Sequence, residues 1–176
     1  MADLNRDDIH RELTRAPANY RALLAAAACD RLPAKTDGTR WTNREMLFHL
    51  LLGYLVVRSL LPLVRLVSRL PPGVGRRFAA TLNAGARPFH LVNFLGSVAG
   101  GHALSLPRMA GLFDRTCAGL ARGLAQCGDA DLRRGMPFPK RWDPFFTDHM
   151  TILDVYHYPL QHYQFHRGQL TLDTAS

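Results

Sequence analysis

Two histidines four residues apart form the clearest chemical pattern in the sequence. His162 and His166 lie in the segment HYQFHRGQL near the C-terminus. On a helix, residues four apart project within about 40° of each other, so the two imidazoles can share one metal ion. The same spacing also occurs between histidines that only pack together, and that structural role is the alternative. The pair indicates a metal site that needs a further ligand.

His49 is the natural third ligand because it lies in the most apolar stretch of the chain, LFHLLLGYLVV. A buried imidazole without a partner is costly, and coordination of a metal ion removes that cost. Three neutral imidazoles leave open positions on zinc, nickel, iron or manganese for a water or a substrate thiol. For the remaining histidines we expect isolated surface or core positions: His10, His90, His102, His149 and His157.

Two further residues lie one helical turn before these histidines. Tyr158 precedes His162 by four residues, and we assign it to substrate binding because its hydroxyl can donate to a metal-bound ligand; simple packing is the alternative. Glu45 precedes His49 by four residues and can orient that histidine as a hydrogen-bond partner. Its position three residues after Thr42 also predicts a helix-capping role, which is sufficient to explain it.

Helices must position these residues, and the hydrophobic spacing predicts helices throughout. Apolar residues recur three and four apart over residues 5–30. The capping box that begins at Thr42 starts a second helix, apolar nearly all round, which continues to about residue 67. We expect Pro62 to kink or split this second helix.

The second half of the chain contains two more long helices and an irregular segment. We expect one or two short helices in a crossover over residues 76–103, then a third helix that Ser105 caps and that stops at Gly128. Residues 136–150, rich in proline and aromatics, should form an ordered loop. Thr151 with Asp154 opens the last helix, over 151–172, kinked or started late at Pro159.

The apolar second helix raises the question of a membrane. A membrane span needs about 20 apolar residues, but Arg58, Pro62 and Arg65 interrupt this run. An arginine in the bilayer centre costs about 2.5–3.5 kcal/mol even on insertion scales. We therefore expect a buried core helix and no membrane span, with a membrane-surface protein as a further alternative.

Length and cysteine content indicate one domain, residues 1–176, in a reducing compartment. Hydrophobic residues make up 47% of the 176 residues and charged residues 20%, as in a globular protein. The three cysteines form no CxxC pair, which argues against a disulfide framework or a zinc knuckle. The charged N-terminus has no secretory pattern. These features predict a cytoplasmic protein.

The charge is uneven along the chain. The formal net charge is +8, and residues 46–113 contain seven arginines but no Asp or Glu. Such a segment favours a small anionic substrate, an anionic membrane surface or a phosphate backbone. We expect at least two of its arginines at the mouth of the cavity that holds the histidines. No helix-turn-helix, RNP or zinc-finger pattern is present, so we expect no nucleic acid partner.

Two of these segments carry a resemblance to a known family. WTNREMLFHL (41–50) and HYQFHRGQL (162–170) are similar to the DinB/YfiT-like superfamily, which has a histidine in its second helix and an HxxxHxGQ signature in its last. The resemblance implies an all-α four-helix bundle with a long helical crossover between helices two and three. It also implies a divalent metal ion held by His49, His162 and His166, with Gly168 and Gln169 completing the signature.

The resemblance also implies a range of functions. The superfamily includes thiol S-transferases and isomerases that use bacillithiol, mycothiol or glutathione, and metal-dependent hydrolases. We therefore expect a metal-dependent enzyme, with thiol-dependent S-transfer or isomerisation as the leading reaction and a low-molecular-weight thiol as co-substrate. A non-catalytic bundle that binds a metal or another ligand, as a homodimer, is the alternative. The arginine-rich segment between helices two and three is longer than in a minimal member.

Overall fold

The computed structural model describes residues 5–27 and 29–172, and this part of the chain is mostly helical. It contains seven helices and two short strands, which are α1 (Arg6–Ala26), α2 (Asn43–Val67), α3 (Pro72–Ala84), α4 (Ala86–Ala103), α5 (Leu106–Ala125), α6 (Asp129–Leu132), β1 (Gly135–Pro137), β2 (His149–Thr151) and α7 (Ile152–Arg167).

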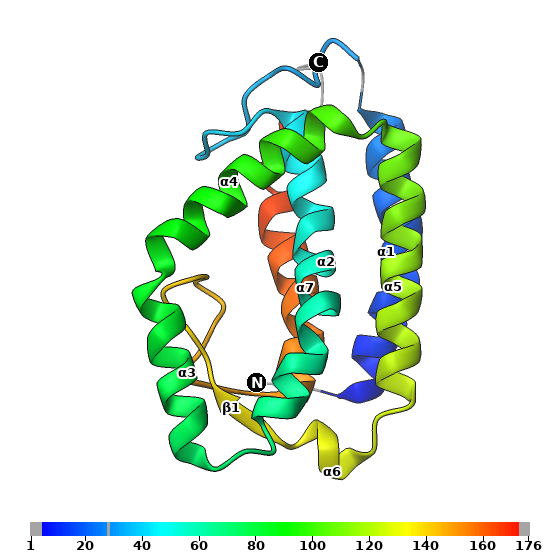
Figure 1. Cartoon of the computed structure of the whole chain (residues 1–176). Coiled ribbons are helices and arrows are strands. Elements are labelled where there is room, and N and C mark those ends of the chain that lie inside the picture. Colours follow the sequence, from blue (N-terminus) through cyan, green and yellow to red (C-terminus); the bar gives the residue numbers. More distant parts are fainter. Residues whose placement is uncertain (1–4, 28, 173–176) are drawn as a thin grey trace.

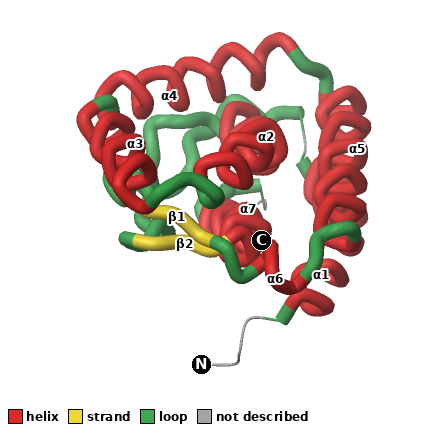
Figure 2. The backbone as a smooth tube through the Cα atoms, turned by 60° about the horizontal axis from the view of Figure 1, so that its bottom comes forward, coloured by secondary structure: helices red, strands yellow, loops and turns green. Residues whose placement is uncertain are grey.

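Four long helices form a bundle, and the other elements extend to one side of it. Helix α1 packs along α5, while α2 packs on α7, α5 and α4. Figures 1 and 2 show α2 and α7 in the middle, α1 and α5 on one side and α3 on the other, with α4 running from α3 across α2 to the start of α5. The predicted all-α fold, with a helical crossover between the second and third bundle helices, is confirmed.

Capping residues set the beginnings of the two central helices. Thr42 accepts a hydrogen bond from the amide of Glu45, and the Glu45 carboxylate accepts one from the Thr42 amide. Thr151 and Asp154 form the same capping box at α7. Each box satisfies backbone donors that lack a partner within the helix.

Neither proline within these helices divides its helix. Helix α2 continues through Pro62 to Val67, so the predicted split does not occur. Helix α7 begins before Pro159 and ends at Arg167, so a late start and an end at 172 are both wrong. Proline removes one hydrogen bond and crowds the preceding turn, and the tertiary packing of both central helices compensates for this cost.

The crossover brings α4 directly against the backbone of α2. Gly101 makes this approach possible, because a Cβ atom at that position would lie 3.0 Å from the Cα of Glu45. Arg44 links α2 to the end of α4, because its guanidinium donates hydrogen bonds to the carbonyl oxygens of Gly101 and Leu104. The crossover therefore consists of two helices, α3 and α4, of which α4 packs against α2.

The segment predicted as a loop over 136–150 contains strand residues at both ends. Strands β1 and β2 pair antiparallel, with Met136 opposite Met150. Both methionines are buried in the main core. The sequence did not indicate these strands because each has only three residues, too few to show a period of two.

Aromatic side chains fill the centre of the bundle. The ring of Tyr20 stacks on Phe113 with 4.2 Å between ring centroids, and Tyr54 and Tyr163 pack around the same phenylalanine. The Tyr20 hydroxyl donates to the carbonyl oxygen of Leu47 at 2.8 Å. These contacts join α1, α2, α5 and α7 just beyond the predicted histidine site.

Helix α2 is long and apolar enough to cross a membrane, and none of the other helices in the described ranges is. Within the bundle it contacts α4, α5 and α7, and 14 of its 25 residues are buried. Arg58 and Arg65 reach from it to carbonyl oxygens of α5. Its place as the core helix accounts for its apolar composition.

Candidate metal centre

The three histidines predicted as ligands converge in the structure. The ring centroids of His162 and His166 are 4.5 Å apart, and that of His49 lies 4.8 Å from the first and 4.7 Å from the second. One ligand nitrogen from each residue lies within 4.8 Å of the other two. His49 and His162 are buried and His166 is half-buried. We call these three residues the histidine cluster.

The hydrogen bonds of Ser97 favour a proton on Nδ1 of His49. Ser97 on α4 donates its hydroxyl proton to the carbonyl oxygen of Asn93 at 2.8 Å. The Ser97 oxygen, 3.1 Å from His49 Nδ1, is therefore free to accept the Nδ1 proton. The other nitrogen, Nε2, is buried and has no hydrogen-bond partner among the described residues. Its lone pair is available to a ligand in the histidine cluster.

His166 is oriented in the same way from the end of α7. Its Nδ1 lies 2.6 Å from Oε1 of Gln169, an amide oxygen that can only accept, so the proton is on Nδ1. The Nε2 lone pair of His166 is thereby left free. Gln169 belongs to the signature identified in the sequence, and this bond gives a physical reason for its presence there. Gly168 is the C-cap residue of α7.

A glycine on α2 makes room for His162. A Cβ atom at Gly53 would lie 2.8 Å from His162 Nδ1, closer than such atoms approach. The Nδ1 atom is buried, and no hydrogen-bond partner for it occurs in residues 5–27 or 29–172. The other ring nitrogen, Nε2, lies 4.0 Å from Oδ2 of Asp143. The ring is thus held between α2 and the β1–β2 loop.

Burial keeps all three imidazoles neutral. Burial, and to a smaller extent the neighbouring His166, lowers the pKa of His49 from 6.5 to about 3. Burial also lowers the pKa of His162 well below 6.5, with His49 and His166 adding to the shift. The pKa of His166 is lowered by burial, against opposing contributions from Gln169 and Asp143. Neutral imidazole is the form that binds metal ions.

Asp143 and Tyr158 form a hydrogen-bonded pair next to the histidine cluster. The Tyr158 hydroxyl donates to Asp143 Oδ2 at 2.8 Å, and the Tyr158 ring centroid lies 5.5 Å from that of His162. Burial raises the pKa of Asp143, although hydrogen bonds from Phe145 and Tyr158 oppose the shift. A carboxyl group with a raised pKa beside the histidines can hold or release a proton there.

Three residues of the site were not identified from the sequence. Ser97 lies in the crossover, and Asp143 in the aromatic loop, so neither has a fixed spacing from the histidines. Trp41 stacks on His49 with 4.3 Å between ring centroids. Trp41 begins the WTNREMLFHL motif, and this position was the one sequence signal that could have placed it at the site. Glu45 acts in the capping box and lies 3.4 Å from His102.

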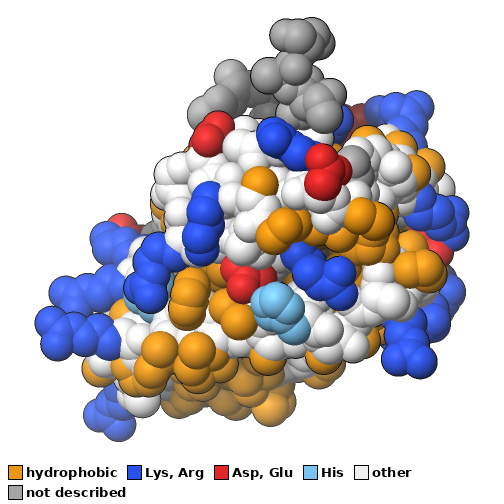
Figure 3. All heavy atoms as spheres, turned by 90° about the horizontal axis from the view of Figure 1, so that it is seen from above, with side chains coloured by type: hydrophobic (Ala, Val, Ile, Leu, Met, Phe, Trp, Pro, Cys, Tyr) orange, Lys and Arg blue, Asp and Glu red, His pale blue; other side chains and the backbone are white. Residues whose placement is uncertain are grey.

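The arginines of segment 46–113 have several different partners. Arg58 donates to a backbone carbonyl of α5, Arg65 to the hydroxyl of Tyr156, and Arg69 to an aspartate of α6. The face seen from above shows Lys and Arg side chains spread over it and along its edges, with hydrophobic side chains between them (Figure 3). A role of these arginines at the mouth of the histidine site stays a prediction.

Comparison with known proteins agrees with this geometry. A family model described as the DinB superfamily matches residues 12–170, which is nearly the whole chain. The matched region includes all three histidines. Neither curated proteins nor solved structures gave a match to the chain.

Proposed function

Because the chain belongs to the DinB superfamily, we propose that it is a metal-dependent enzyme whose divalent ion is held by His49, His162 and His166. One observation carries this proposal. Hydrogen bonds to Ser97 and Gln169 hold the protons of two rings on the outer side, so that unprotonated nitrogens face the histidine cluster. Histidine ligands in metal sites are oriented in this way by the partner of their second nitrogen.

The donor set suits zinc, nickel or iron, for which imidazole is a good ligand. When bound, such an ion acts as a Lewis acid that favours the deprotonated form of a coordinated water or thiol at neutral pH. Ser97 and Gln169 keep the imidazoles oriented, and Trp41 covers one face of His49. Asp143 holds a proton-accepting oxygen near the histidine cluster, in a hydrogen bond with Tyr158.

We propose thiol-dependent S-transfer or isomerisation as the reaction class, with a low-molecular-weight thiol as co-substrate. Family membership and the neutral three-imidazole site support this class, since such a site binds thiols as thiolates. A non-catalytic bundle that binds a metal or another ligand is the second candidate. The thiol measurement below separates the two.

Metal binding is tested first, on the full chain freed of metal with a chelator. We expect one zinc ion per chain after reloading and gel filtration, measured by elemental analysis. His49→Ala, His162→Ala and His166→Ala should each lower this content several-fold. His157→Ala is the matched control, because His157 lies on α7 but outside the histidine cluster. Unchanged zinc content in the His49→Ala and His162→Ala proteins would refute the metal proposal.

Thiol binding is then tested on the protein loaded with cobalt(II), whose visible spectrum reports its ligands. Glutathione, mycothiol and bacillithiol are added in turn. A new sulfur-to-metal absorption band with one of them supports the thiol-dependent reaction. If none of them changes the spectrum of a fully loaded protein, the non-catalytic alternative is favoured.

A further inference from the structure

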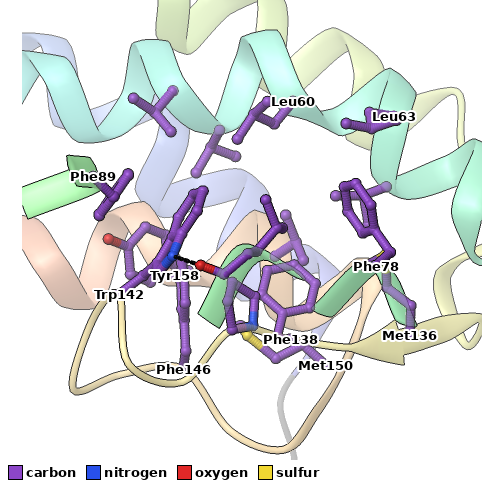
Figure 4. Close-up of a pocket in the computed structure, with 16 residues that line it drawn as sticks. Leu60, Leu63, Phe78, Phe89, Met136, Phe138, Trp142, Phe146, Met150 and Tyr158 are labelled. Atoms are coloured by element: carbon purple, nitrogen blue, oxygen red, sulfur yellow. Dashed lines mark hydrogen bonds between the residues drawn. The ribbon is translucent and has the colours of Figure 1, made fainter. Parts of the chain in front are cut away.

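An apolar cavity lies one helical turn away from the histidine cluster. Its volume is about 120 Å³, and side chains from α2, α3, α4, α7 and the 136–150 segment line it. Leu60 and Leu63 on α2 face Phe138 and Phe146 of the loop across the cavity (Figure 4). The arrangement follows from the long crossover, which places α3 and the start of α4 over this end of α2.

The lining of the apolar cavity has no charged side chain, and its polar groups already have partners. The indole Nε1 of Trp142 donates to the carbonyl oxygen of Leu82 at 2.7 Å. The hydroxyl of Tyr158 donates to Asp143 at 2.8 Å. A charged or strongly polar ligand would lose its hydration here without gaining hydrogen bonds in return. The cavity therefore selects uncharged, apolar groups.

The size of the cavity and its access to solvent fit a small ligand. Apolar cavities of about 150 Å³ in proteins stay dry and bind benzene, so the present volume suits a single ring or a branched aliphatic group. Leu60 and Leu63 are each 39% exposed although they line the cavity. They therefore form its rim, where a ligand can enter.

The apolar cavity and the histidine cluster share a wall. On α7, Tyr158 lines the cavity and His162 follows one turn later; their ring centroids are 5.5 Å apart. On α2, Val57 lines the cavity, and Gly53, against which His162 packs, precedes it by one turn. On both α2 and α7, a residue that lines the cavity is therefore one helical turn away from a residue at the histidine cluster.

We propose that the apolar cavity binds an uncharged aromatic or branched aliphatic group, and that this group is the apolar part of the substrate whose reacting end reaches the histidine cluster. The preference for an apolar group follows from the lining of the cavity alone. The assignment of that group to the substrate rests on the proposed metal-dependent function. The two parts are tested separately.

The first experiment uses the metal-free protein, and the probe is toluene, with benzoate as its charged counterpart. Binding is followed by ligand-observed NMR. Toluene should bind at least tenfold more tightly than benzoate. Leu60→Trp and Leu63→Trp, which fill the rim, should each weaken toluene binding at least tenfold. Leu66→Trp is the matched control, because Leu66 lies on the same helix, is 59% exposed and does not line the cavity; its affinity should be that of the wild type.

This experiment tests the apolar preference of the cavity independently of metal binding. Absence of toluene binding, equal binding of benzoate, or equal losses in Leu63→Trp and Leu66→Trp would each overturn the apolar site.

The second experiment uses the zinc-loaded protein and compares phenylmethanethiol with ethanethiol. The aromatic thiol should bind at least tenfold more tightly, and Leu63→Trp should remove this advantage. Equal affinities for the two thiols, with toluene binding intact, would overturn the assignment to the substrate and leave the cavity as a separate ligand site. A protein that takes up no zinc would refute the proposed function and this assignment together, while the toluene result still stands.

Discussion

Removal of the Ser97 hydroxyl is expected to weaken metal binding without removing a ligand. Ser97 and His49 are both buried, and the Ser97 oxygen lies 3.1 Å from His49 Nδ1. In Ser97→Ala the Nδ1 proton has no acceptor, which costs the metal-free protein about 1–3 kcal/mol of stability. The proton can also move to Nε2, where it blocks the lone pair. Loss of such an orienting partner typically weakens metal affinity about 10–100-fold, equivalent to roughly 1.4–2.7 kcal/mol.

The measurement is zinc affinity by competition with a chromophoric chelator, together with urea unfolding of the metal-free protein. Thr116→Val is the matched control: Thr116 is also buried on a helix, and its hydroxyl donates to the carbonyl four residues earlier, but it forms no hydrogen bond with a histidine in the described structure. We expect this variant to keep wild-type zinc affinity. Wild-type affinity in Ser97→Ala as well, despite lower stability, would refute an orienting role for Ser97.

Two further predictions concern close packing and a buried thiol. Gly53→Ala should lower zinc content because the new methyl would displace His162. In Gly96→Ala the nearest neighbour of the new methyl is 3.9 Å away, so this variant should keep wild-type zinc content and gain about 0.5–1 kcal/mol of stability from helix propensity. Elemental analysis and urea unfolding check both variants, and equal zinc contents would contradict the prediction for Gly53. Burial raises the pKa of Cys117 to about 12, so its reactive thiolate is scarce at pH 8 and increases about tenfold per pH unit up to that value. Exposed Cys29 should supply the fast phase of alkylation at pH 8, and a fast phase of unchanged size in Cys29→Ser would argue against this reasoning.

Local signals in the sequence were sufficient to predict the bundle helices and the pair His162 and His166. Four-residue spacing places His162 and His166 on one face of α7 without knowledge of the fold, and the capping boxes mark the starts of α2 and α7. The convergence of His49 with that pair depends on how α2 packs on α7. That packing came from the family resemblance and not from spacing.

The residues that sequence reasoning missed are those brought in by tertiary structure. Asp143 reaches the histidine cluster because paired strands close the 136–150 segment against α7, and three-residue strands leave no periodic pattern. The continuity of α2 through Pro62 was also unpredictable locally, since a proline normally interrupts a helix. Contacts with α4, α5 and α7 hold the two halves of α2 in line.

The crossover therefore connects the stability of the bundle to the chemistry of its site. Ser97 can orient His49 only while α4 lies against α2, and that approach depends on the missing side chain of Gly101 and on the bonds from Arg44. The same crossover supplies Phe89 to the apolar cavity, from the opposite end of α4. One helix thus contacts both the proposed metal site and the proposed apolar site. A displacement of α4 would therefore change the orientation of His49 and the shape of the cavity together.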